Sequence, residues 1–186
     1  MIDLYTWHTP NGRKVSIMLE EIGMPYNTFP INIAKDEQFQ PHFLEVSPNN
    51  RIPAIVDKEN NNYSLFESGA ILMYLAEKSG KLINKSNSDE YYRTIEWLMW
   101  QMGGVGPMFG QVHHFVKYNK GKSAYAEERY SKEARRLYGV MDKRLGQHQY
   151  ISGKEYSIAD ISIWPWTARF DWQEIDLSEY KNITRW

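Results

Sequence analysis

A proline at the start of a predicted strand is the feature that most constrains the fold of this chain. Pro53 directly precedes the apolar run 54–56, and proline has no amide hydrogen to donate to a sheet. The bond between Ile52 and Pro53 is a candidate for the cis form, which proteins use in tight turns. Such a turn leaves the backbone amide and carbonyl of Ile52 outside the sheet.

A second constraint lies in the pair Glu67-Ser68, which stands directly ahead of an apolar periodic run. We expect Ser68 to be the N-cap of a helix, and the free amides of a helix N-terminus attract a carboxylate. The backbone groups of Ile52 would pair with an extended peptide. Together the two features predict a site for a small acidic peptide.

The first 80 residues predict a βαβ unit followed by a ββα unit, hence a mixed four-stranded sheet with helices. Thr9 and Pro10 are expected as N-cap and first residue of a helix that ends at Gly23. A strand–helix–strand order implies a parallel pair with a right-handed crossover. The remaining elements are a short helix and an antiparallel hairpin. The expected ranges are strands at 2–5, 27–31, 54–56 and 63–66, helices at 10–22 and 39–44, and a helix from residue 68.

Residues 81–89 are polar and predict a linker, and residues 90–186 carry almost no strand signal. One helical face is expected to contain Ile95, Leu98, Met99 and Met102, with a kink or a loop at 103–107. Further helices are expected at 130–145 and from residue 157, where Ser and Asp have capping-box spacing. The chain therefore predicts an α/β domain at 1–80 and an all-helical domain at 90–186.

Composition excludes several classes of function. The 22 basic and 23 acidic residues nearly cancel, so nucleic acid and anionic membranes are not expected partners. No apolar run approaches the roughly 20 residues of a membrane span, and the N-terminus has no signal-peptide pattern, so a cytoplasmic location is expected. Cysteine is absent, which excludes a disulfide, a thiolate metal site and a redox thiol. Any thiol chemistry must use sulfur brought by a ligand.

These motifs resemble those of the cytosolic glutathione transferases, and in detail those of the Nu-class branch, which is associated with glutathione-dependent disulfide reduction. The resemblance implies a thioredoxin-like N-terminal domain with a cis-proline, an all-helical C-terminal domain and a homodimer. The chain stops at Trp186, where such proteins usually continue through another helix or so, so the C-terminal domain is expected to be short. The matching segments are 9–12, 38–39, 47–56, 65–71, 100–108, 113–115 and 156–161.

The resemblance implies that Thr9 Oγ and Asn11 donate hydrogen bonds to the sulfur of glutathione. A free thiol titrates near 8.5, and a hydroxyl, an amide and a helix N-terminus together would lower that pKa. The alternative for Thr9 is a helix cap alone. Tyr5 is another candidate for this role, because several transferase classes use a tyrosine near the first strand. It lies inside the predicted strand here, so we expect it to be packed.

The resemblance also implies how the rest of the tripeptide binds. Ile52 would offer its backbone to the cysteinyl part, and Pro53 would fix the turn. Glu67 would pair with the ammonium, while the hydroxyl and amide of Ser68 take the γ-glutamyl carboxylate. The alternative for Ser68 is a simple cap, which is compatible with binding.

Three more residues match glutathione-lining positions of this branch. Gln38 and Arg51 would line the glycyl side, with a solvated surface pair as the alternative. Arg129 would reach toward glutathione from the helical domain, with an exposed helix charge as the alternative. Adjacent histidines at 113–114 point about 100° apart on a helix and lack a third ligand, so no metal is expected.

The function that follows is a glutathione-dependent thiol–disulfide oxidoreductase, in which the thiolate of bound glutathione, as co-substrate, attacks a small disulfide. The first alternative is conjugation of glutathione to a small electrophile, which needs an apolar second pocket. The second alternative is a non-catalytic scaffold that keeps the fold for protein contacts. Residues expected to build the apolar pocket are Met108, Phe109, Phe115 and Tyr118.

Overall fold

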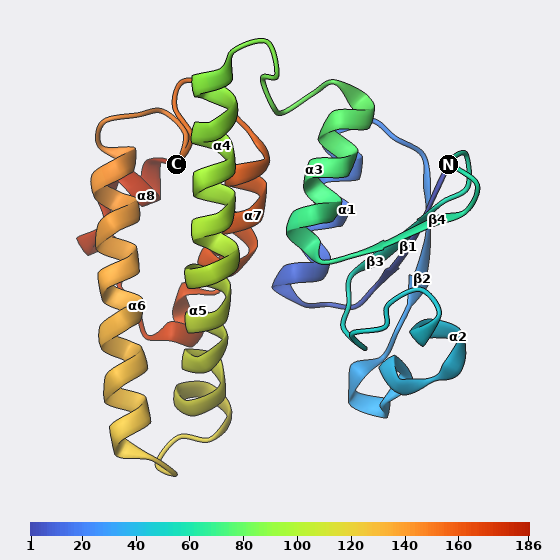
Figure 1. Ribbon diagram of the computed structural model, residues 1–186. Helices are drawn as coiled ribbons and strands as arrows, with labels where there is room; N and C mark the ends of the chain where they lie inside the picture. The colour runs from blue at the N-terminus through green and yellow to red at the C-terminus, as the bar shows by residue number, and fades with distance from the viewer. The chain divides into compact units, whose positions relative to one another are not determined.

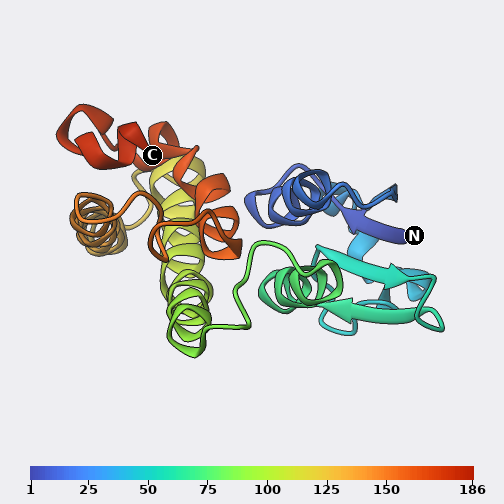
Figure 2. The same ribbon diagram turned by 90° about the horizontal axis from the view of Figure 1, so that it is seen from above.

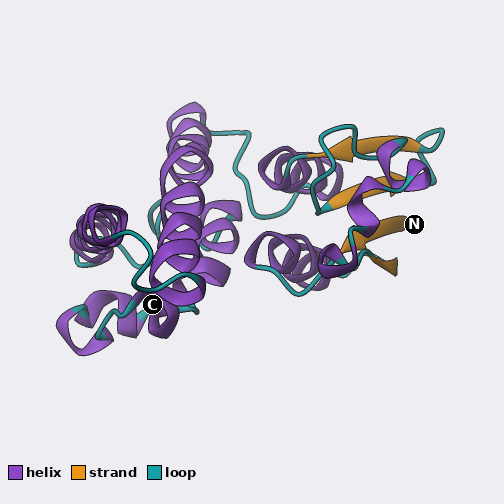
Figure 3. Cartoon of the chain, turned by 90° about the horizontal axis from the view of Figure 1, so that it is seen from below, coloured by secondary structure: helices purple, strands orange, loops and turns teal.

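The computed structural model describes residues 1–186 and divides into two compact units, Met1–Lys81 and Leu82–Trp186. The four strands belong to the first unit, and the second is helical (Figures 1 and 3). The expected linker 81–89 contains the first two residues of the first long helix of the second unit. None of the helices is both long and apolar enough to cross a bilayer.

The first unit is built on a mixed sheet with the strand order β2-β1-β3-β4. Strands β1 and β2 pair in parallel, whereas β1–β3 and β3–β4 pair antiparallel. The predicted mixed four-stranded sheet is thus confirmed, with bounds within about a residue or two of those expected. The strands are β1 (Ile2–Thr6), β2 (Tyr26–Pro30), β3 (Ala54–Asp57) and β4 (Tyr63–Phe66).

Helices α1 (Pro10–Ile22) and α3 (Ser68–Ser79) lie side by side against one face of the sheet (Figure 2). A smaller apolar cluster around Phe43 of α2 (Pro41–Leu44) also includes Ala54 and Ile31. Tyr5 stacks on Phe29 and packs against Phe43, so it is a packed strand residue, as expected. Two short 3₁₀ helices, η1 (Ile33–Lys35) and η2 (Glu37–Phe39), precede α2.

Helix α1 begins and ends where the sequence predicts, whereas α3 does not begin as predicted. The Thr9 hydroxyl oxygen accepts a hydrogen bond from the Gly12 amide at 3.1 Å, and Gly23 closes α1 in the left-handed conformation. The expectation that Ser68 is an N-cap is wrong: the N-cap is Glu67, at φ +70°, and Ser68 is the first helical residue. Strand β4 ends at Phe66, so the chain changes direction at Glu67 alone.

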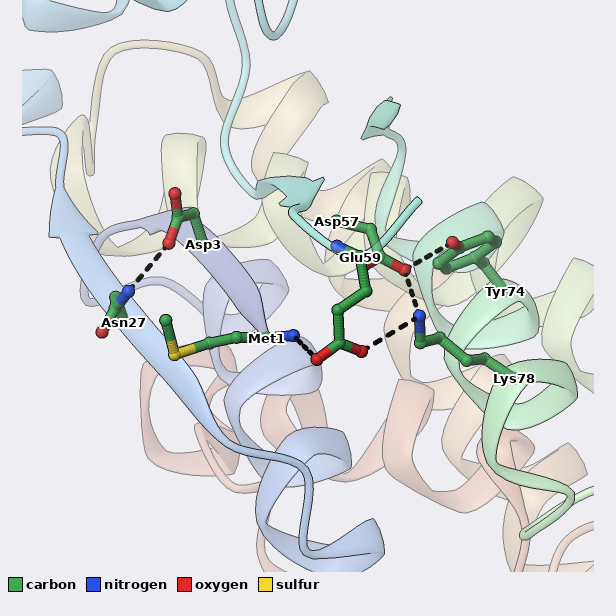
Figure 4. Close-up of polar contacts among 7 residues, drawn as sticks. All are labelled: Met1, Asp3, Asn27, Asp57, Glu59, Tyr74 and Lys78. Carbon is green, nitrogen blue, oxygen red and sulfur yellow. Dashed lines mark hydrogen bonds and ion pairs between the residues drawn. The ribbon is translucent and has the colours of Figure 1, made fainter. Parts of the chain in front are cut away.

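A cluster of hydrogen bonds and ion pairs connects the hairpin β3–β4 to α3 and to the N-terminus (Figure 4). The buried Asp57 carboxylate accepts hydrogen bonds from the Tyr74 hydroxyl and the Lys78 ammonium, each at 2.6 Å. Burial alone would raise the pKa of Asp57, but these hydrogen bonds outweigh it and hold the pKa below its usual value. Glu59 adds ion pairs to Lys78 at 3.7 Å and to the amino group of Met1 at 2.5 Å.

The second unit has a core of helices that pack through apolar residues such as Phe109, Tyr138 and Ile163. Its buried side chains come mainly from the helical segments between residues 105 and 166, and the partly buried Trp97 and Trp100 pack against it. The elements are α4 (Ser88–Trp100), η3 (Gln101–Val105), α5 (Gly106–Val112), η4 (His113–Tyr118), α6 (Ala124–Leu145), α7 (Ile158–Thr167), η5 (Phe170–Gln173), η6 (Leu177–Glu179) and α8 (Lys181–Arg185).

The glycine-rich segment 103–107 does not interrupt the helix, contrary to expectation. The chain widens into a π-helical turn, η3, and continues directly into α5. The buried positions before and within this turn are Leu98, Gln101 and Val105. Met99, expected on that buried face, is 47% exposed. A Cβ atom at Gly106 would lie 2.7 Å from Gln101 Nε2, so the Gln101 side chain would have to shift.

The predicted capping box at the start of α7 is confirmed. The buried Asp160 carboxylate accepts from the Ser157 amide at 3.1 Å and the Ser157 hydroxyl at 3.2 Å. Its other oxygen accepts from the Ile151 amide at 2.9 Å and from Trp186 Nε1 at 2.8 Å. One side chain therefore joins α7 to the preceding loop and to the last residue of the chain.

We predict that Asp160→Ala lowers the free energy of unfolding by about 3 kcal/mol, because buried donors lose their charged acceptor. Chemical denaturation followed by circular dichroism and tryptophan fluorescence measures the loss. The matched control is Asp176→Ala, which removes an exposed carboxylate that accepts one amide bond, from Ser178. A loss no larger than that of the control would contradict the prediction.

Candidate functional site

The strand register brings four segments of the first unit to one end of the sheet. Tyr5 pairs with Ala54, and Ala54 pairs with Phe66, so the chain leaves β1, enters β3 and leaves β4 at the same end. Strand β2 is parallel to β1 and also leaves there, with Pro30 beside Thr6. The residues in the adjoining segments are Thr9, Asn11, Gln38, Arg51, Ile52, Pro53, Glu67 and Ser68.

The turn between β1 and α1 presents Thr9 and Asn11 at a helix N-terminus. The Thr9 hydroxyl oxygen accepts a hydrogen bond from the Gly12 amide, and this bond does not use the hydroxyl proton. A side chain at Gly12 would collide with Thr6 Oγ1 and with the Trp7 carbonyl oxygen, which explains glycine there. Asn11 is half-buried in the first turn of α1. Capping by Thr9 and donation to a ligand atom are therefore compatible.

The segment before β3 leaves a backbone edge outside the sheet. The Ile52–Pro53 bond is cis, as expected. The pairing of β3 with β1 covers Ala54–Asp57, so the backbone of Ile52 lies beyond the ladder. The buried Ser47 hydroxyl donates to the Arg51 carbonyl at 2.8 Å and supports the segment, while the Arg51 side chain is exposed.

Gln38 is buried, so the alternative of a solvated surface residue does not hold for it. It lies on η2, and its Nε2 atom is 3.4 Å from the Asp36 carboxylate. Its Oε1 atom is buried without a hydrogen-bond partner in the protein. Buried amide oxygens are nearly always paired, so this oxygen is an exception in the structure.

Lys14 is a polar residue of this region that the sequence analysis missed. It lies on α1 with its side chain fully buried, and its ammonium donates to Ser68 Oγ at 3.1 Å. Burial lowers the pKa of Lys14 to about 7, and the nearby Glu67 carboxylate partly opposes that shift. A signal was present: Lys14 stands four residues before Met18 and so shares the buried face of α1.

In the second unit, Arg129 lies on α6 with an exposed side chain. Of the residues expected to build an apolar pocket, Phe109 is fully buried and stacks on Tyr138 at 5.0 Å. It belongs to the core and does not line a pocket, so that expectation is wrong for Phe109. Phe115 stacks on Tyr130, and Tyr118 is exposed.

The two adjacent histidines, His113 and His114, lie in different environments. His113 is buried between Trp166 and Trp172, and its Nε2 atom is 3.1 Å from Gln173 Nε2. Burial is the main cause that lowers the pKa of His113 to about 4. His114 is exposed, and no group of three or more potential metal ligands occurs in the structure. His113 is therefore a core histidine.

Sequence comparison places the chain in a family. Residues 1–77 match the glutathione S-transferase N-terminal domain, and residues 124–186 match the C-terminal domain. Disulfide-bond oxidoreductase YfcG of Escherichia coli is 47% identical, covering 100% of this chain and 88% of YfcG. Disulfide-bond oxidoreductase YghU of the same organism is 41% identical, covering 100% and 69%. The chain belongs to the glutathione S-transferase family.

Solved structures agree with that assignment. A glutathione transferase family member from Pseudomonas fluorescens, crystallised with two glutathione molecules bound, has a TM-score of 0.93 at 47% identity, covering 99% of this chain and 85% of that one. A glutathione transferase from Pseudomonas putida, with one glutathione disulfide bound per subunit, has a TM-score of 0.91 at 44% identity, covering 99% and 84%. The thioredoxin-like and helical architecture expected from the sequence is therefore confirmed.

We predict that Lys14→Met is more stable than the wild type at pH 6, by on the order of 2 kcal/mol, because it removes a buried charge. An unfolded lysine keeps its proton to about pH 10.5, whereas folded Lys14 releases it near pH 7. Wild-type stability therefore rises between pH 7 and pH 10, and the advantage of the variant shrinks. Urea denaturation across this range measures both trends, and a parallel pH dependence of the two proteins would contradict the prediction.

Proposed function

We propose that this chain is a glutathione-dependent thiol–disulfide oxidoreductase of the Nu-class type. The observation that carries the proposal is the convergence at one sheet end of three features. These are the helix N-terminus with Thr9 and Asn11, the backbone edge at Ile52, and the start of α3 with Ser68. They match the sulfur, peptide backbone and carboxylate of glutathione. The relatives named as disulfide-bond oxidoreductases support the reaction class.

The chemistry uses sulfur from the co-substrate, because the chain has no cysteine. The thiolate of bound glutathione attacks one sulfur of a small disulfide, forms a mixed disulfide and releases the other sulfur as a thiolate. A second glutathione thiolate then attacks the mixed disulfide, which releases the second thiol and leaves glutathione disulfide. Two glutathione molecules are oxidised for each disulfide reduced.

The contribution of the protein is to increase the fraction of thiolate and to orient the sulfur atoms. A free thiol near pKa 8.5 is only a few per cent thiolate at pH 7. A decrease of about two pKa units requires about 2.7 kcal/mol of preferential stabilisation of the anion. The Thr9 hydroxyl, Asn11 and the α1 N-terminus would supply it together.

The remaining residues would bind the ends of the tripeptide. Glu67 pairs with the ligand ammonium, Ser68 and the first amides of α3 take the γ-glutamyl carboxylate, and the Ile52 backbone takes the cysteinyl part. Gln38 is buried on η2, and its place at the glycyl side stays a prediction. Arg51 and Arg129 are exposed and stay predictions, as do the homodimer and the cytoplasmic location.

Conjugation of glutathione to an electrophile would use the same thiolate, but it needs an apolar second pocket. The burial of Phe109 in the helical core removes one of the side chains expected to build such a pocket. Steady-state rates with hydroxyethyl disulfide and with a chloronitroaromatic compound separate the two reactions. The proposal predicts faster turnover of the disulfide, and preference for the aromatic compound would contradict it.

Asn11→Ala should lower kcat with the disulfide by about 10²-fold while changing the affinity for glutathione far less, because a thiolate donor acts mainly on the anion. Ultraviolet absorbance of the bound thiolate, followed against pH, reports the thiol pKa directly. We expect that pKa to rise in the variant. Unchanged turnover and an unchanged thiol pKa would refute the role of Asn11 at the sulfur.

Ser68→Ala should weaken glutathione binding about tenfold with a smaller effect on kcat, because it removes a hydrogen bond to a charged group. Isothermal titration calorimetry measures the dissociation constant. Ser16→Ala is the matched control, since its hydroxyl donates within α1 to the Arg13 carbonyl. Equal affinities of the wild type and Ser68→Ala would show that Ser68 does not contact the ligand.

A further inference from the structure

Lys14 is the one buried cation of the chain, since no other lysine or arginine is buried. Its side chain has no exposed surface and lies between α1 and α3, the two helices that pack most extensively in the first unit. Removing an ammonium from water carries a free-energy penalty that hydrogen bonds inside the protein commonly offset only in part. An unbranched apolar side chain would fill the same space without that penalty. Packing alone therefore does not explain a lysine at this position.

The contact of Lys14 with Ser68 has a defined direction. An ammonium group only donates hydrogen bonds, so at 3.1 Å the Lys14 nitrogen donates and Ser68 Oγ accepts. The proton of the Ser68 hydroxyl is then directed away from Lys14. Ser68 is the first residue of α3, where the backbone amides of the first turn have no partner within the helix.

We propose that Lys14 is a positioning residue for the carboxylate-binding end of the glutathione site, acting through Ser68. With Lys14 as an ammonium, the Ser68 hydroxyl donates to the ligand carboxylate in front of α3. With Lys14 as a neutral amine, the lone pair on nitrogen accepts that proton and the hydroxyl turns inward. This inference rests on the function proposed above, and it adds that the protonation of Lys14 regulates binding at the same site.

The charges around Lys14 make the two forms interconvert near neutral pH. Burial lowers the pKa of Lys14 to about 7, and Glu67 is the carboxylate that opposes this shift. A ligand carboxylate at the start of α3 brings a further negative charge near the ammonium and favours the protonated form. The other ionisable side chains of the packed elements are Arg13, Glu20 and Glu21 on α1, Asp3 and Tyr5 on β1, Asp57 on β3, Tyr63 on β4, and Tyr74, Glu77 and Lys78 on α3.

Linkage gives the sign of the effect on binding. If the ligand binds the protonated form more tightly, affinity is highest below the pKa of Lys14 and falls as the pH rises through it. A rise of one unit in that pKa on binding corresponds to about a tenfold loss of affinity between pH 6 and pH 9. Affinity for a ligand without a thiol should therefore weaken with pH.

The experiment is calorimetric titration with S-methylglutathione, which has no thiol, from pH 6 to pH 9. Over this range the affinity of the wild type for S-methylglutathione should fall about tenfold more than the affinity of Lys14→Met. The ligand amine titrates in the same range for every protein, so the difference between the proteins isolates Lys14. The matched control is Arg13→Met, which removes an exposed charge from the adjacent position of α1 and should follow the wild type.

Equal pH profiles for the wild type and Lys14→Met would overturn the inference and leave the proposed function standing. A wild type that binds no S-methylglutathione at millimolar concentration at any pH would refute the proposed function itself. If Lys14→Met does not fold, nuclear magnetic resonance of lysine side chains in the wild type gives the same answer. We expect the Lys14 pKa to rise when the ligand is added, and an unchanged value would overturn the inference.

Discussion

The pairing of Tyr5 with Ala54, and of Ala54 with Phe66, is the constraint on which the site depends. This register makes three strands share one end, and the parallel partner β2 delivers a fourth segment to it. A slip of one residue would move every side chain of a strand to the other face of the sheet. The core beneath α1 and α3 opposes such a slip, so the same apolar packing that stabilises the first unit also fixes the site.

At the start of α3, two features that suit ligand binding are unfavourable for the stability of the fold. The chain turns from β4 into the helix at Glu67, whose positive φ is unfavourable for a residue with a side chain. A lysine is buried behind Ser68, and the burial of its charge opposes folding. Both features lie at the helix N-terminus that the proposal assigns to a carboxylate. Unfavourable local choices of this kind are typical of functional sites, where other parts of the fold compensate for them.

Much of the fold follows from local rules that the sequence displays. Thr9, Pro10 and Gly23 delimit α1, the spacing of Ser157 and Asp160 predicts the start of α7, and Pro53 predicts the cis bond. The misassignments arise where tertiary packing decides. Glu67 rather than Ser68 is the N-cap, because the chain turns directly after β4.

Other features could not be read from periodicity alone. The spacing of apolar residues made the expected buried face too wide: Leu98, Gln101 and Val105 are buried, whereas Met99, on α4 ahead of the π turn at Gln101–Val105, is exposed. Phe109 is buried in the helical core, although its sequence neighbours suited a pocket wall. Lys14 lies on the buried face of α1, but charged residues are so seldom buried that sequence analysis passes over them.

The central claim is that the sulfur of bound glutathione becomes a thiolate at the N-terminus of α1. A crystal structure of this protein with oxidised glutathione tests it most directly, because it shows where both sulfur atoms lie. The account predicts one sulfur within hydrogen-bond distance of Thr9 Oγ or the Asn11 side chain, with the γ-glutamyl carboxylate at Ser68. A tripeptide bound elsewhere, or one whose sulfur atoms lie beyond reach of both residues, would contradict it.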